Sequence, residues 1–152
     1  MADRPIEAQA QPPVRYVGFW KRVLATLIDS VLFAIVMGPL LIAVYGVDYF
    51  LPDPGVGFIR GPLDLLISWI LPAVLVLLFW SYRQATPGKM LISAKIADAA
   101  TGGIPSDGQL LGRYLGYFLS MIPLGLGLLW VAFDSRKQGW HDKLAGTIVI
   151  TR

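Results

Sequence analysis

The chain has 152 residues, of which 55% are hydrophobic and only 15% charged, and its mean hydropathy is +0.61. A soluble domain carries about 25% charged residues, so this composition argues against a water-soluble fold and predicts a membrane protein. The net charge of +3 does not indicate nucleic-acid binding, because membrane proteins collect Lys and Arg on cytoplasmic loops and no basic stretch interleaves with aromatic residues. The absence of cysteine excludes disulfides and thiolate metal sites.

The first long apolar stretch follows a polar tail. Residues 1–14, rich in Pro, Ala and Gln, are expected to be a disordered cytoplasmic tail, and residues 15–152 a single transmembrane domain. The stretch 23–45 contains Asp29 as its only charged residue. About 20 apolar residues suffice for a helix to cross about 30 Å of hydrocarbon, so we predict a first transmembrane helix, which Pro39 kinks or ends.

The second apolar stretch covers residues 63–82 and follows a loop at 46–61 that is rich in Gly, Pro and Asp. We predict a second transmembrane helix there, bent at Pro72. Asp64, close to its start, is expected to cap the helix at the outer interface, where an acid complements the helix N-terminus. Residues 81–90 then form a polar break before a short strand or interfacial segment.

The third apolar stretch, 110–133, allows two topologies. Ser106 should cap its helix, because Ser-Asp-Gly-Gln matches the capping box. The stretch is long enough to cross the bilayer once, yet Pro123, Gly125 and Gly127 interrupt its middle. It therefore forms either a third span or a broken helical hairpin, in which non-helical backbone is buried in protein.

The distribution of Lys and Arg favours the hairpin. Four of the thirteen lie in residues 1–22, one in the loop 46–61, and four in residues 134–152. The positive-inside rule then places the N-terminus in the cytoplasm, and only a hairpin returns the basic C-terminal tail to the same side. The fold class is thus an all-α membrane protein with a small cytoplasmic strand pair, in which TIVIT (147–151) pairs with LISAKIAD (91–98).

Ionisable residues at membrane depth are the candidates for chemistry. Arg22 and Asp29 are seven residues apart, so they share one helix face with Thr26 between them. An unpaired charge at such depth costs several kcal/mol, so Asp29 must protonate or find a partner and should face protein or water. Asp29 is therefore either a proton or cation site or a structural hydrogen-bonding group.

The C-terminal tail contributes a second group, His141 and Asp142. Neighbouring helix residues point about 100° apart, so the two do not form a catalytic dyad, and a structural histidine is favoured over a catalytic one. No nucleophile–base pair and no metal-ligand set appears, so neither an enzyme nor a cofactor is expected. Gly112 and Gly116 permit close helix approach, either between copies or within one chain.

Three segments carry a resemblance to a known family: GFWKRVLATLIDSVL in the first span, TPGKMLISAKIADAATGG in the middle and RKQGWHDKLAGTIVI near the end. Over residues 16–151 the chain resembles the RDD family of bacterial membrane proteins, named for one arginine and two aspartates. The resemblance implies that this triad is Arg22, Asp29 and Asp142. It also implies the bacterial cytoplasmic membrane, with cation/proton antiport described for some relatives.

Two functions fit these observations. The first is a small transporter or ion-coupled permease, in which Asp29 binds a proton or Na⁺, Arg22 tunes it, and Asp142 approaches Arg22 as a gate-like ion pair. Two or three helices enclose little interior, so a homo-oligomer in the lipid bilayer is expected. The alternative is a non-transporting membrane scaffold or accessory subunit, whose Arg–Asp network only locks helix packing.

Overall fold

The structure is a computed structural model that describes residues 13–55 and 57–152. The expected disordered tail, residues 1–14, lies outside the described residues except for its last two. The elements are α1 (Phe19–Tyr45), the 3₁₀ turn η1 (Val47–Phe50), α2 (Pro62–Asp64), the π-helical turn η2 (Leu65–Ile70), α3 (Leu71–Arg83), α4 (Pro87–Leu91), β1 (Ala94–Asp98), α5 (Asp107–Met121), α6 (Leu126–Leu129), the 3₁₀ turn η3 (Trp130–Ala132), α7 (Trp140–Ala145) and β2 (Thr147–Thr151).

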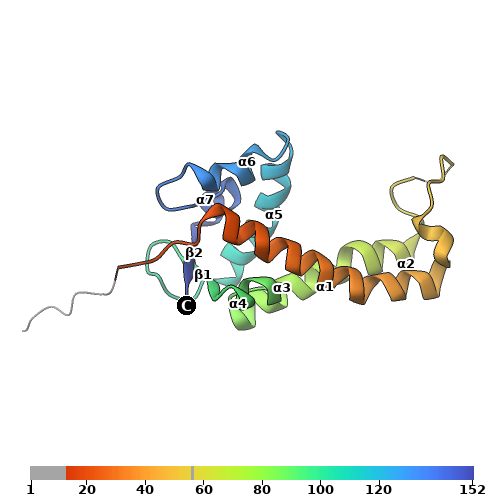
Figure 1. The fold of residues 1–152 in the computed structure, drawn as a ribbon, viewed down its shortest axis with the longest axis horizontal. Coiled ribbons are helices and arrows are strands. Elements are labelled where there is room, and N and C mark those ends of the chain that lie inside the picture. The colour runs from red at the N-terminus through yellow and green to blue at the C-terminus, as the bar shows by residue number, and fades with distance from the viewer. Residues whose placement is uncertain (1–12, 56) are drawn as a thin grey trace, which may run out of the picture.

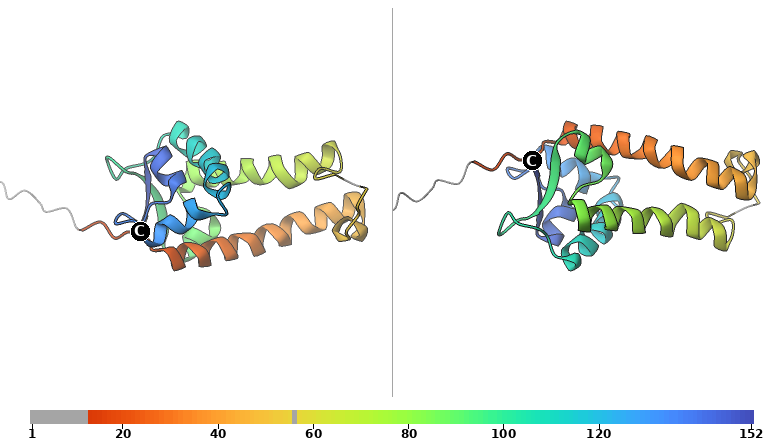
Figure 2. Two further views of the ribbon diagram at one scale, coloured as in Figure 1. Left: turned by 90° about the horizontal axis from the view of Figure 1, so that it is seen from above. Right: turned by 90° about the horizontal axis from the view of Figure 1, so that it is seen from below.

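Two long apolar helical segments form a hairpin. Figure 1 and Figure 2 show α1 running beside the continuous segment α2–η2–α3, while the elements from α4 onward gather at the end of the hairpin where α1 begins and α3 finishes. Both segments are long and apolar enough to cross a membrane, and only 17% of the most apolar window of each is buried in the protein. Apolar faces of this size need lipid around them, so the protein is an integral membrane protein.

The structure decides between two expectations for Pro39 and corrects one for Asp64. Pro39 does not end the first helix, which continues to Tyr45, so the alternative that remains is a kink. Asp64 is not the N-cap of the second span, which is Gly61, but it lies in the first helical turn as an acid near the helix N-terminus. It is 1% exposed, and its carboxylate accepts hydrogen bonds from the Arg60 amide at 2.8 Å and from the hydroxyls of Tyr49 and Ser68, each at 2.6 Å. These contacts tie the connecting loop to the second span at the far end of the hairpin.

The third apolar stretch is broken. Helix α5 and the short helical segment at 126–132 meet at an angle of 115°. Leu124 and Gly125 adopt left-handed backbone conformations that turn the chain, and Gly127 then packs on Ser120 so closely that a Cβ there would lie 2.7 Å from its Cα. The interruption predicted from Pro123 and the glycines is thus the point at which the chain folds back on α5.

The predicted strand pair is present. β1 and β2 are antiparallel, with Ala94 opposite Thr151 and Asp98 opposite Thr147. The segment before α1 joins the other edge of β2, because the Val17 amide donates to the Val149 carbonyl at 2.9 Å. Chain segments from both ends of the sequence therefore meet at one sheet.

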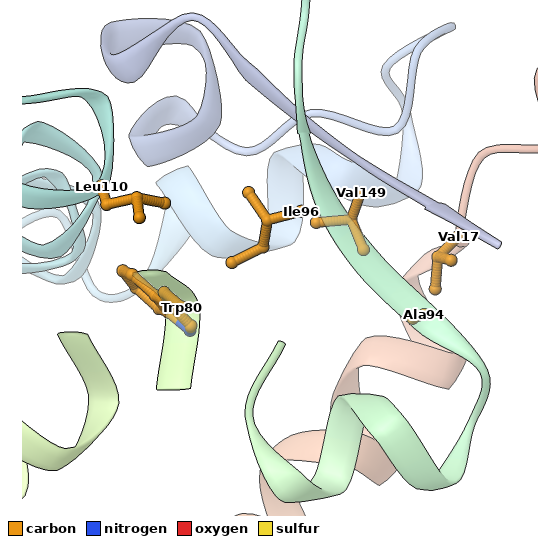
Figure 3. Close-up of a cluster of buried hydrophobic side chains, with 6 residues drawn as sticks. All are labelled: Val17, Trp80, Ala94, Ile96, Leu110 and Val149. Atoms are coloured by element: carbon orange, nitrogen blue, oxygen red, sulfur yellow. The ribbon is translucent and has the colours of Figure 1, made fainter. Parts of the chain in front are cut away.

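A buried apolar cluster joins this sheet to the helices. Figure 3 shows its six side chains, which come from the N-terminal segment, α3, both strands and α5: Val17, Trp80, Ala94, Ile96, Leu110 and Val149. The predicted capping box holds the start of α5, since the Ser106 hydroxyl accepts from the Gln109 amide and the Gln109 side chain accepts from the Ser106 amide. The domain at the base of the hairpin thus has its own core.

The small-residue pair of α5 gives a matched test of this packing. A Cβ on Gly116 would lie 2.9 Å from the His141 Cα, whereas a Cβ on Gly112 meets nothing within 4 Å. We expect Gly116→Ala to destabilise the fold by about 1–3 kcal/mol through overpacking, and Gly112→Ala to be neutral or stabilising by about 1 kcal/mol through helix propensity. Thermal unfolding of the purified protein in detergent measures both, and equal effects would contradict this account of how α5 packs on α7.

Candidate functional site

Asp142 is the centre of a buried network of charges. It lies in the first turn of α7 with its side chain fully buried. One carboxylate oxygen accepts from Arg22 Nη1 at 2.5 Å and from the Gly139 amide at 3.0 Å. The other accepts from Arg113 Nη1 and, at 3.4 Å, from the Thr147 hydroxyl. The single negative charge is therefore shared by two arginines from different helices.

Arg22 connects the first span to the tail. Its Nε donates to the Val17 carbonyl at 3.1 Å and its Nη2 to the Lys137 carbonyl at 2.5 Å, while Nη1 binds Asp142. The planar guanidinium has donors in a fixed fork, which suits it to hold three acceptors at once. The approach of Asp142 to Arg22, expected from a returning tail, is present in the structure.

Arg113 is the second arginine of the network, and the sequence analysis did not single it out. Its side chain is fully buried on α5, with the guanidinium carbon 5.3 Å from the Trp80 ring centroid. It donates to the Thr147 hydroxyl at 2.9 Å and to the Tyr117 hydroxyl at 3.3 Å. The available signal was a lone cation inside an apolar stretch, which must find a partner when buried.

Asp29 is held apart from this network. Its carboxylate accepts from the Thr86 hydroxyl at 2.5 Å and from the Gly88 amide at 2.7 Å. The first amides of a helix have no partner within the helix, so the acid on α1 satisfies one at the start of α4. Arg22 and Asp29 share a helix face in sequence, yet the structure directs them to different partners and gives no hydrogen bond between them.

The segment 86–91, expected to fall mostly in a polar break, is in fact packed helix. A Cβ on Gly88 would collide with the Ala25 carbonyl and lie 2.9 Å from Asp29 Cγ, so glycine is required for α4 to touch α1. Lys89 follows and is only 7% exposed. Its ammonium lies 3.5 Å from the Thr86 hydroxyl, which itself donates to Asp29, so the three residues form a polar chain.

A cavity of about 550 Å³ lies between α1, α5 and α6. Five polar or ionisable residues line it: Arg22, Thr26, Lys89, Tyr117 and His141. The remaining lining is apolar or glycine: Phe19, Val23, Leu27, Met121, Leu124, Gly125, Leu128, Leu129 and Val131. This volume is within the range of ligand sites, which are mostly apolar with a few placed polar groups.

His141 lies in the cavity wall beside the network. Its ring stacks on Tyr117 with centroids 4.0 Å apart, and its Nε2 is 3.5 Å from the nearer Asp142 oxygen. Burial, together with the positive charges of Arg113 and Arg22, lowers the pKa of His141 far below its ordinary value of 6.5. The imidazole is therefore neutral at physiological pH and acts here as a packed aromatic ring.

The structure thus divides the residues singled out in the sequence. Arg22, Asp142 and His141 come together, whereas Asp29 lies on Thr86 and Gly88, and Thr26 lines the cavity. Within residues 13–55 and 57–152, no three His, Asp or Glu side chains gather closely enough to hold a metal ion. The site therefore consists of the Asp29 and Asp142 carboxylates, the positively charged side chains near them and the cavity beside them.

Removal of the Asp142 charge tests the network. We expect Asp142→Asn to destabilise the fold by about 3–5 kcal/mol, because it leaves two arginines buried without their counter-charge. Asp48, exposed in η1, gives the matched control, and Asp48→Asn should change stability by less than about 0.5 kcal/mol. Thermal unfolding in detergent compares the two, and equal stability of both variants would contradict the role assigned to Asp142.

The neutral state of His141 predicts a pH dependence. The unfolded chain binds a proton at this residue below about pH 6.5 and the folded protein does not, so folding stability is complete above that pH and falls below it. As the pH falls below about 6.5, the free energy of unfolding should decrease by an amount that approaches about 1.4 kcal/mol per pH unit. Unfolding temperatures between pH 7.5 and 5.5 measure this slope, and His141→Gln should flatten it; an unchanged slope would rule out His141 as its source.

Comparison with known proteins finds several bacterial relatives of the chain. The chain is 28% identical over 148 residues to the uncharacterized protein YxaI of Bacillus subtilis, covering 88% of this chain and 95% of that one. It is 42% identical over 72 residues to an uncharacterized protein of Rickettsia prowazekii, covering 47% of this chain and 39% of that protein.

A third relative is the proline-rich antigen of Mycobacterium leprae, 24% identical over 87% of this chain and 60% of the antigen. The chain therefore spans about two fifths of the Rickettsia relative and three fifths of the mycobacterial one. No solved structure matches the chain. The RDD family model matches residues 16–146, a range that holds Arg22, Asp29, Arg113 and Asp142, and the chain belongs to the RDD family.

Proposed function

We propose that this protein is a small transporter or ion-coupled permease of the bacterial cytoplasmic membrane. The observation that carries the proposal is the polar chain from the cavity to the membrane-embedded acid: Lys89 lines the cavity, its ammonium contacts the Thr86 hydroxyl, and that hydroxyl donates to Asp29. A proton taken up at the cavity has a path of adjacent polar groups to the carboxylate. Ionisable groups buried in membrane proteins commonly mark such relays.

In this proposal the two carboxylates have different roles. Asp29 is the proton or Na⁺ site, because only neutral groups, a hydroxyl and an amide, bind it directly. Asp142 is fixed between Arg22 and Arg113 and keeps the base of the cavity in place. Arg22 thus acts through Asp142 and the cavity wall, not by contact with Asp29. The protein binds and transfers ions and is not an enzyme.

Orientation and assembly complete the proposal. By the positive-inside rule, the basic residues before α1 and after η3 support an orientation with the N-terminus and the sheet domain in the cytoplasm. One hairpin of two helices cannot surround a passage, and the α1 residues that line the cavity all belong to the first third of that helix, Phe19 to Leu27. We therefore infer that several copies assemble in the bilayer and complete the route between them.

A non-transporting scaffold is the second candidate. Its supporting observation is that both acids accept several hydrogen bonds from the protein itself, as purely structural acids do. In that role Arg22–Asp142 locks the tail to the first span, and Asp29 locks α4 to α1. The two candidates differ in whether Asp29 changes its protonation or ion occupancy during function.

Proton flux in proteoliposomes separates the candidates. A Na⁺ or K⁺ gradient across vesicles containing the wild-type protein should drive proton movement, which a pH-sensitive dye inside the vesicles reports. Asp29→Asn should reduce this flux at least about tenfold, yet still fold, because the amide can accept from Gly88 and donate to Thr86. Asp48→Asn is the control and should retain the flux.

The scaffold role makes the opposite prediction for the same vesicles. Wild-type protein that is folded and inserted but moves no protons under any of these gradients would overturn the transport proposal. Asp29→Asn would then change only thermal stability or assembly. Unfolding temperature and the size of the detergent-solubilised particle, measured on the same preparations, provide that second readout.

A further inference from the structure

We propose that the cavity between α1, α5 and α6 binds a single-chain acidic amphiphile of the fatty-acid type. Its acid group would lie at Lys89, and its acyl chain along the apolar wall formed by the rest of the lining. The inference goes beyond the proposed function, with which it shares only the cavity and Lys89. Binding of such a molecule requires neither an ion gradient nor proton transfer.

The positively charged residues at the base of the cavity favour an anionic ligand. Two buried cations, Lys89 and Arg113, and the half-buried Arg22 lie near two carboxylates, and both arginines share Asp142. None of the ion pairs in the described part of the chain includes Lys89, and the nearby Asp29 reaches its ammonium only through the Thr86 hydroxyl. An acid group delivered by a ligand would give the buried ammonium a direct partner and offset part of the cost of its burial.

Lys89 is well placed to receive that group. Lys89 is only 7% exposed and lines the cavity. Among residues 13–55 and 57–152, its ammonium makes one hydrogen bond, to the Thr86 hydroxyl, which is long at 3.5 Å. An ammonium has three donors, so most of its capacity is left for a ligand oxygen. Arg22 adds to the positive potential at the same end of the cavity, where it also forms part of the lining.

The opposite wall fits an acyl chain. It is formed by aliphatic side chains that continue from the cavity onto the outer surface, where Leu27 is 59% exposed, Met121 61% and Leu124 95%. Leu27 belongs to the membrane-spanning helix, so this surface lies against lipid. A free phosphate or small carboxylate would leave the wall empty, whereas an acyl chain buries it and continues into the bilayer.

The size of the cavity favours one chain. Its volume of about 550 Å³ suits a drug-sized ligand, and a fatty acid is of that size, whereas a complete two-chain phospholipid is larger. The occupant is therefore a single acyl chain with a terminal acid. One chain of an anionic phospholipid, with its phosphate at Lys89, presents the same chemistry and is treated as a second source in the test.

The first measurement needs no variant. Radiolabelled palmitate is bound to the full-length protein in a neutral detergent, with palmitic acid methyl ester and octanoate as competitors. We expect palmitate itself to compete at least about tenfold better than the methyl ester, which lacks the charge, and better than octanoate, which has a short chain. Equal competition by acid and ester would overturn the proposal, because the charged base would then have no role.

Two pairs of variants locate the site. Lys89→Met should weaken palmitate binding at least about tenfold and leave ester binding unchanged, and Lys95→Met, on β1 away from the cavity lining, is its control.

The second pair tests the site of the acyl chain. Leu128→Trp should block the acyl chain by filling the cavity, whereas Ile122→Trp, 76% exposed and outside the lining, should not. Undiminished palmitate binding by folded Leu128→Trp would show that the acid binds elsewhere and would overturn the assignment.

A last comparison identifies the source of the ligand. Protein in nanodiscs of phosphatidylcholine is compared with protein in nanodiscs containing phosphatidylglycerol. Loss of palmitate binding in the anionic discs would support the site with a bilayer lipid as its occupant, and retained binding would support it with free fatty acid. Palmitate binding by a protein that moves no protons would leave this inference standing while the transport proposal fails, so the two are tested separately.

Discussion

The rest of the structure depends on the burial of one carboxylate between two arginines. Asp142 is removed from water on α7, and only the charges of Arg22 on α1 and Arg113 on α5 make that burial tolerable. Removing ions from water costs several kcal/mol each, so the three residues are stable together and unstable singly. Because they come from the two ends and the middle of the chain, this requirement brings α1, α5 and α7 into one unit at the base of the membrane hairpin.

Asp29 is stabilised in a different way from Asp142. Asp29 lies within the first span, and Thr86 and Gly88 supply neutral hydrogen-bond donors to it. The glycine has no side chain, so the backbone of α4 can approach α1 closely enough for its amide to reach the carboxylate. A carboxylate stabilised by neutral donors can exchange a proton or cation more readily than one fixed in two ion pairs. This contrast is the physical basis of the proposal that Asp29 exchanges a proton or cation while Asp142 has a structural role.

The cavity lies where these two arrangements meet. Arg22 and Lys89 reach its lining from the Asp142 network and the Asp29 chain respectively, and the turn between α5 and α6 closes its apolar side. The fold-back of the third apolar stretch therefore does more than return the chain toward the sheet. It places aliphatic side chains opposite a charged base, an arrangement that neither a straight third span nor two isolated helices would produce.

The sequence alone predicted the elements whose causes are local. The two spans follow from apolar length, the start of α5 from its capping box, and the break after Met121 from Pro123 and the glycines. The approach of Asp142 to Arg22 was expected from a returning tail, but the other partners were decided only by the tertiary structure: Asp29 is 57 residues from Thr86, and Arg113 is 29 from Asp142. Helical periodicity tells which side chains share a face, but a shared face does not say what packs against it. Arg22 and Asp29 therefore looked like a pair in the sequence, and the fold gave each a different partner.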